Sequence, residues 1–118
     1  MIGIHPTAPT WSATSGATPL ATATATVVKA AIADPVSIYL TDLQIVNVHA
    51  TVSTVITILD DTTVVWTGYL PAMTVALVAV PVNAQLSAPI KITAGKALNI
   101  KAVTTGATIY WNAQGFIA

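Results

Sequence analysis

Small or apolar residues alternate with hydroxyl-bearing residues along most of the chain. The clearest example is the segment 21–27, in which Ala and Thr follow one another in turn before Val27. A period of two places successive side chains on opposite faces of an extended backbone, as in a half-buried β-strand. Interleaved Thr and Val, whose χ1 angles are restricted, also disfavour the helix that the alanines alone would allow. The pattern therefore predicts strands.

Eight short strands are expected from residue 22 onward, separated by turns rich in Gly, Pro and Asp. Val, Ile, Thr, Tyr and Trp dominate these segments, which is typical of pleated surfaces. The turn signals recur about every 8–12 residues, a spacing that favours an all-β sandwich or barrel. The expected fold is a jelly-roll-like antiparallel β-sandwich. The predicted strands cover residues 22–32, 36–48, 51–59, 63–70, 74–80, 84–92, 97–103 and 107–117.

The first twenty residues follow a different pattern. Three prolines lie there among Thr, Ser, Ala and Gly, without a usable periodicity. Because proline lacks a backbone N–H donor, this segment is expected to be an extended arm rather than part of a sheet. Trp11 within the arm needs a surface to dock on, either its own domain or a neighbour. A disordered tail with an incidental Trp is the alternative. The predicted organisation is an N-terminal arm over residues 1–20 and a β-sandwich domain over residues 21–118.

Composition limits the classes of partner. Charged residues make up 7% of the 118 residues and hydrophobic residues 54%, and the formal net charge is +0. Four scattered lysines are too few to neutralise several phosphates at once, so nucleic acid is not an expected partner. No run of about 20 apolar residues is present, so a membrane-spanning helix is not expected. A surface with so little charge favours burial against partner subunits, and we expect an oligomer.

Candidate chemistry is sparse. No Ser-His-Asp order, phosphate-cradling glycine loop or pair of facing carboxylates stands out, so we expect no enzymatic activity and no cofactor. Asp60-Asp61 is the one acidic pair in the sequence. A hairpin turn explains it better than a calcium site, because adjacent side chains in a strand point to opposite faces. His49, two residues after Asn47, lacks the further ligands that a zinc site needs.

Four residues are candidates for an interface. Trp11 is the expected anchor of the arm. His49 at a subunit contact would make assembly sensitive to pH, and an oligomer mass that stays unchanged between about pH 5 and 8 would disprove this. Tyr110 and Trp111 are expected to fill the core or a subunit interface. Exposed aromatic side chains such as Tyr69, Tyr110 or Trp111 would also suit a sugar-binding face.

The last predicted strand has two different faces. Alternation places Ile109, Trp111 and Ala113 on one face and Tyr110, Asn112 and Gln114 on the other.

Three segments, Thr57–Ala72, Ala97–Lys101 and Thr104–Gly115, resemble those of a known class of protein. They are similar to segments of small virion structural proteins of tailed bacteriophages, of the head decoration (cement) type. The resemblance covers about residues 38–118 and leaves the arm unmatched. Where an Asp-Gly turn is usual in that class, this chain has Asp60-Asp61.

The resemblance implies a jelly-roll-like fold, no enzymatic activity, and a homotrimer that binds the major capsid protein at threefold positions of the phage head. It also implies a location on the capsid surface of the virion, after synthesis in the host cytoplasm.

Two alternative functions stay open. One is a carbohydrate- or receptor-binding β-sandwich module of a phage tail or fibre. The other is a self-assembling surface-layer or pilus-like subunit, which would form open filaments or sheets.

Overall fold

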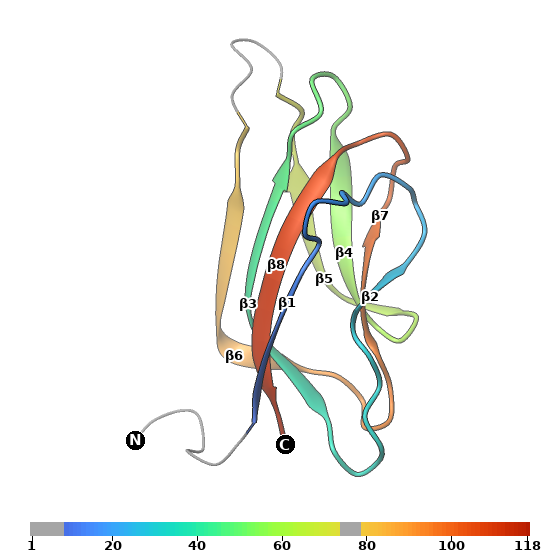
Figure 1. Ribbon diagram of the computed structural model, residues 1–118, viewed down its shortest axis with the longest axis vertical. Helices are drawn as coiled ribbons and strands as arrows, with labels where there is room; N and C mark the ends of the chain where they lie inside the picture. Colours follow the sequence, from blue (N-terminus) through green and yellow to red (C-terminus); the bar gives the residue numbers. More distant parts are fainter. Residues whose placement is uncertain (1–8, 74–78) are drawn as a thin grey trace.

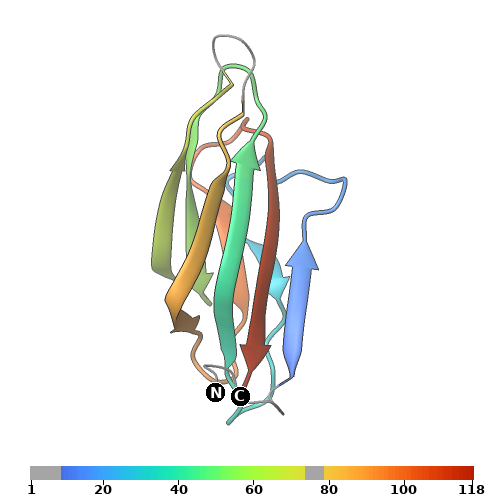
Figure 2. The same cartoon turned by 90° about the vertical axis from the view of Figure 1, so that its left-hand side faces the viewer.

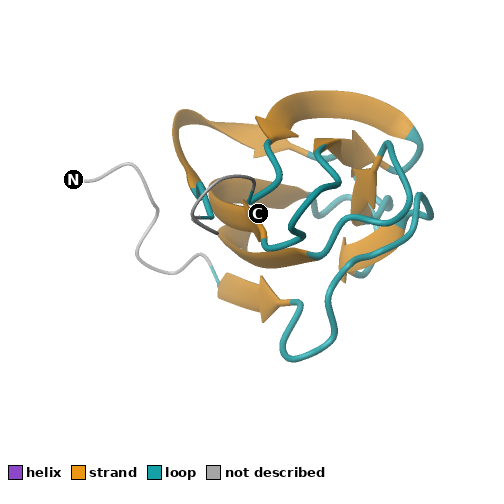
Figure 3. Ribbon diagram, turned by 90° about the horizontal axis from the view of Figure 1, so that it is seen from above, coloured by secondary structure: helices purple, strands orange, loops and turns teal. Residues whose placement is uncertain are grey.

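The computed structural model describes residues 9–73 and 79–118. All the regular secondary structure in these residues is β-strand (Figure 1; Figure 3). The strands form two four-stranded sheets that pack face to face. They are β1 (Thr10–Thr14), β2 (Thr26–Lys29), β3 (Ile38–Asn47), β4 (Thr54–Asp60), β5 (Thr63–Leu70), β6 (Val82–Lys91), β7 (Leu98–Ala102) and β8 (Ile109–Ile117).

The strand order is that of a jelly roll. The first sheet has the order β1-β8-β3-β6 and the second has the order β2-β7-β4-β5, with antiparallel neighbours throughout. Apart from the β4–β5 hairpin, each strand is followed along the chain by a strand of the other sheet. Figure 2 shows the four strands of the first sheet side by side. The predicted all-β, jelly-roll-like sandwich is therefore confirmed.

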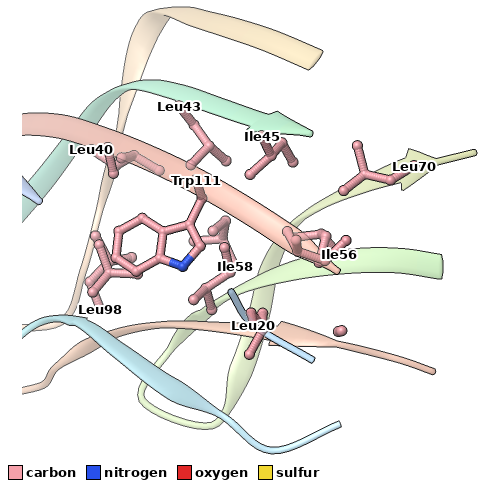
Figure 4. Packing of buried hydrophobic residues seen from close by; sticks show 14 of the residues in the cluster. Leu20, Leu40, Leu43, Ile45, Ile56, Ile58, Leu70, Leu98 and Trp111 are labelled. Carbon is pink, nitrogen blue, oxygen red and sulfur yellow. The ribbon is translucent and has the colours of Figure 1, made fainter. Parts of the chain in front are cut away.

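A single hydrophobic core lies between the two sheets (Figure 4). Alternate side chains of each strand point into it, as two packed sheets require. Apolar burial of this kind, at about 25 cal/mol per Å² removed from water, is the main term that stabilises the domain. The core residues of the central strands are Ile38, Leu40, Leu43 and Ile45 of β3, Ile56 and Ile58 of β4, Leu98, Ile100 and Ala102 of β7, and Ile109, Trp111 and Ala113 of β8.

One irregularity in β3 decides which of its residues face the core. Leu40 and Leu43 are both 1% exposed and face the core. Leu43 comes three positions after Leu40, and simple alternation would place side chains at that odd spacing on opposite faces. The register shifts between Leu40 and Asp42 against both neighbouring strands, which indicates a β-bulge. The extra residue brings Leu43 and Ile45 into the core and leaves Asp42 and Gln44 on the outer face.

The expectation that residues 1–20 lie outside the sheets is wrong for β1. Thr10–Thr14 pairs with β8 along its whole length and forms an edge of the first sheet. Leu20 is a core residue and forms an isolated bridge with Ile109. Pro9 immediately precedes β1, where a missing N–H donor does not interrupt the ladder. The N-terminal part of the chain is therefore integrated into the domain from residue 9 onward.

Most of the other strand predictions are confirmed. β5 has the predicted bounds, and β3, β4, β6, β7 and β8 differ from the prediction by at most three residues at either end. β2 is much shorter than the predicted strand 22–32, since only Thr26–Lys29 pairs with β7. The predicted strand 74–80 falls mainly on residues 74–78, which lie outside the described residues, and its last two residues are not in a strand.

Candidate functional site

Trp11 docks on its own domain. Its side chain is half-buried and packs against the core from the β1 edge. The indole lies against Gly115, its direct cross-strand partner in β8, and Nε1 donates a hydrogen bond to the backbone oxygen of Phe116 at 3.3 Å. Of the two surfaces that the sequence left open for this tryptophan, the structure shows the intramolecular one.

Tyr110 and Trp111 lie on opposite faces of β8, as the alternation predicts. Trp111 is 5% exposed and packs among the aliphatic side chains of both sheets (Figure 4). A side chain this deeply buried fills the core and offers little surface to a partner. Tyr110 is half-buried on the outer face of the first sheet, opposite Val46 of β3.

His49 belongs to a hydrogen-bonded network in the β3–β4 connection. Its ring Nδ1 accepts hydrogen bonds from the backbone N–H groups of Thr51, at 3.1 Å, and Val52, at 3.0 Å. Both contacts lie within the same connection of the chain. The histidine therefore closes a turn of its own chain.

Asn47 supports the same turn from inside the core. It is 0% exposed at the end of β3. Its Oδ1 accepts hydrogen bonds from the N–H groups of His49 and Thr108 at 3.0 and 3.2 Å. Its Nδ2 donates to the carbonyl oxygen of Val52 at 2.7 Å. Asn47 thus joins the β3–β4 connection to the β7–β8 connection, and the burial of a polar group is compensated by three hydrogen bonds.

The predicted hairpin turn at Asp60-Asp61 is confirmed. Asp60 pairs with Thr63, which leaves a two-residue loop, and Asp61 in this loop has a φ of 57°. Thr62 has no positive φ, so the turn is not of type I′, which needs one at both central residues. The Asp60 carboxylate accepts hydrogen bonds from the N–H and the hydroxyl of Thr93 at 3.0 and 2.6 Å, which ties the hairpin to the β6–β7 connection.

The ionisable side chains of the described residues do not form a cluster that could act as a catalytic or metal-binding site. Lys96 Nζ lies 3.9 Å from Asp61 Oδ2, and both side chains are about half exposed, so the pair adds little stability. Within residues 9–73 and 79–118, no group of three or more His, Cys, Asp or Glu side chains is placed to hold a metal ion. The same residues contain no helix that is long and apolar enough to cross a membrane.

The outer face of the second sheet exposes apolar side chains. Tyr69 of β5 is 61% exposed and lies directly opposite Val55 of β4, and Val103, 56% exposed, follows β7 on the other side of Val55. A further row of cross-strand partners consists of Val27, Asn99, Leu59 and Val64, in which Val27 and Val64 are more than half exposed and Leu59 is buried. The row between the two holds Lys101, Thr57 and Thr67. Direct partners share one face of a sheet, so these side chains form one surface, which we call the apolar face.

The outer face of the first sheet has different chemistry. Two rows of direct cross-strand partners run across all four strands, and we call them the amide rows. The rows are Gln85-Asp42-Gln114-Ser12 and Asn83-Gln44-Asn112-Thr14. They contain all three glutamines of the chain and two of its four asparagines. The alternation of β8 predicts two of these amides, but the full rows depend on the register and on the bulge in β3.

Aromatic side chains lie at both ends of the amide rows. Tyr39 and Phe116 are direct partners at one end, with ring centroids 4.7 Å apart and ring planes 8° from parallel. Tyr110 lies at the other end.

The two outer faces, one apolar and one rich in amides, are therefore the candidate functional surfaces of the molecule. Comparisons of the chain with protein-family models, with curated proteins and with solved structures find no match.

Proposed function

We propose that this protein is a non-enzymatic structural protein of a phage virion. In this proposal it is a decoration (cement) protein that binds the outer surface of the head as a homotrimer and stabilises contacts between major capsid subunits. The observation that carries the proposal is the apolar face, which lies exposed on a chain with only 7% charged residues. The resemblance of Thr57–Ala72 and Thr104–Gly115 to head decoration proteins supports the same function.

The apolar face has the chemistry of a protein–protein interface. Exposed apolar side chains that gather on one face mark interaction surfaces, and aromatic residues are enriched in interfaces. Tyr69, with an apolar ring and a hydroxyl, is suited to such a position. Contacts built from apolar burial and hydrogen bonds are screened little by salt, in contrast to surface ion pairs.

A trimer makes weak individual contacts effective. Once one subunit is bound, the other two meet their sites at a high effective concentration, so three modest contacts give a firm attachment. A protein that binds the assembled head and not its separated subunits stabilises the assembly by mass action. This is how a small protein without enzymatic activity would raise the resistance of a capsid to disassembly.

The structure changes which residues we assign to attachment. The sequence favours Trp11 as the anchor, but its indole packs within its own domain. We therefore assign the contact to the apolar face, with Tyr69 and Val103 as its most exposed large side chains.

The test measures oligomeric state and head binding with the same samples. Sedimentation over a hundredfold dilution should give the mass of a trimer, and the protein should co-sediment with undecorated heads of the virus that encodes it. The double variant Tyr69→Ser/Val103→Thr should lose most of the head binding and keep the wild-type unfolding midpoint. The matched control, Gln85→Ser/Asn112→Ser on the opposite face, should bind heads as the wild type does. A protein that does not co-sediment with the heads contradicts the proposal.

A further inference from the structure

We propose that the outer face of the first sheet binds a neutral polysaccharide along the amide rows. This inference goes beyond capsid attachment and does not depend on it, because it concerns the opposite face of the sandwich. Figure 2 looks onto this face, across β6, β3, β8 and β1.

The amides of these rows are available to a ligand. Gln44 and Gln114 are half-buried, and Asn83, Gln85 and Asn112 are exposed. Among the hydrogen bonds between described residues, none uses the side-chain amide of any of these five residues. Each amide offers an acceptor oxygen and two N–H donors. Sugar hydroxyls both donate and accept, so a face of paired amides can satisfy them in either orientation.

The rows also have the apolar component that sugar rings need. Tyr39 and Phe116 form a stacked, half-buried pair at one end, and Tyr110 lies at the other. Ligand sites commonly combine aromatic surface, which packs against the C–H groups of the ligand, with a few polar groups that fix its orientation. Four strands at the usual spacing span roughly 14 Å, so several sugar residues could lie along one row.

Three open hollows follow the amide rows. One of about 200 Å³ is lined by Gln44, Asn112 and Tyr110. A second of about 560 Å³ is lined by Asp42, Gln85 and Phe116. A third of about 330 Å³ is lined by Ser12, Thr41 and Gln114. A surface that is hollowed beside its polar side chains suits an extended chain, whereas a deep single pocket would suit a small ligand.

Charge selects the class of polymer. Asp42 lies within one row, between Gln85 and Gln114, and Lys91 is the direct partner of Tyr39 beyond the rows, so this face carries one charge of each sign. An anionic polysaccharide or a nucleic acid would bring its charges close to this carboxylate. A protein partner would need a largely apolar contact at the centre of the interface, and the rows offer amides and hydroxyls there. A neutral polysaccharide has neither conflict.

Affinity electrophoresis tests the proposal on the full-length protein. Native gels would contain dextran, pullulan, laminarin or galactomannan as neutral probes, with alginate as the anionic comparison. We expect at least one neutral polysaccharide to retard the protein, and the double variant Gln44→Ala/Gln114→Ala to raise the apparent dissociation constant at least tenfold. If that variant does not fold, Gln44→Glu/Gln114→Glu removes the amide donors at nearly constant side-chain size.

The matched control exchanges two side chains on the other face, as Thr67→Ala/Tyr69→Ala. This variant should bind the polysaccharide like the wild type. The absence of retardation by all four neutral probes would overturn the proposal, and so would retardation by alginate alone or retardation that the amide variants leave unchanged. Loss of head binding in the amide variants would assign this face to the capsid and also overturn the proposal.

Discussion

The indole of Trp11 lies across Gly115 and occupies the space that a side chain at position 115 would fill. A Cβ atom built on Gly115 would lie 2.8 Å from Cζ2 of Trp11 and would also collide with the backbone oxygen of Tyr39. An aromatic ring that covers a glycine on the neighbouring strand is a known means of stabilising the edge of a sheet. The pair fixes β1 onto β8 and explains why the N-terminal tryptophan is not free to reach a partner.

Replacement of Gly115 by alanine should therefore destabilise the domain by at least about 3 kcal/mol, because overpacking costs about 1–3 kcal/mol and the closest atom, the Tyr39 backbone oxygen, cannot move aside as a side chain can. The measurement is the urea midpoint of unfolding, followed by tryptophan fluorescence. Gly68→Ala in β5 is the matched control. There the new Cβ would meet only the outer ring of the Trp66 indole, which can move, so the loss should be smaller. Equal losses at the two positions would contradict the close packing of Tyr39 and Trp11 around Gly115.

Removal of residues 1–20 should unfold or strongly destabilise the domain. The deletion takes away β1, the buried part of Trp11, and the two hydrogen bonds that join Leu20 to Ile109. Loss of a fully buried tryptophan costs about 3–5 kcal/mol, and the half-buried Trp11 should account for part of this. Thermal unfolding of the truncated chain measures the effect. A chain that begins at Pro9 keeps these contacts and is the control. An unchanged melting temperature after the longer deletion would contradict the integration of β1 into the fold.

Asn47→Ala should cost about 3 kcal/mol of stability. The substitution leaves the N–H groups of His49 and Thr108 and the carbonyl of Val52 without their partner, and buried unpaired groups cost about 1–3 kcal/mol each. Asn112→Ala, on the exposed outer face of β8, should change stability by less than about 0.5 kcal/mol. Denaturant unfolding of both variants provides the comparison, and similar losses would argue against the buried network.

His49→Ala should loosen the β3–β4 connection, while His49→Asn should largely preserve it. The Asn Oδ1 can take the place of the ring Nδ1 as acceptor for the N–H groups of Thr51 and Val52, whereas Ala offers no acceptor. We expect the alanine variant to lose about 1 kcal/mol. Amide hydrogen exchange at residues 51 and 52 should accelerate in the alanine variant and stay near the wild-type rate in the asparagine variant. Identical exchange in the two variants would contradict the capping role of His49.

The fold could be predicted wherever alternation and turn residues agree. β5 lies between Asp60-Asp61 and Pro71, and its bounds were predicted without error. β1 was missed because it has only five residues, is rich in hydroxyls, and follows a proline. Its partner β8 lies about a hundred residues away in the chain, and local pattern carries no information about such a pairing.

The candidate surfaces were harder to predict, because they depend on register. Simple alternation along β3 from Ile38 would put Asp42 and Gln44 on the core face together with Leu40. The bulge reverses this, and it is a feature of the backbone that the residue types alone do not specify. The apolar face depends likewise on the alignment of Val55 with Tyr69 and Val103.

The central position of β8 has a consequence for synthesis of the protein. β8 follows all the other described strands along the chain, yet it lies between β1 and β3 in the first sheet. While the chain is still on the ribosome, β1 has no partner and β3 lacks one of its two, so both present open edges of the kind that promote aggregation. The first sheet can close only after residues 109–117 have left the ribosome. A chain that ends before β8 therefore lacks the strand that joins β1 to β3.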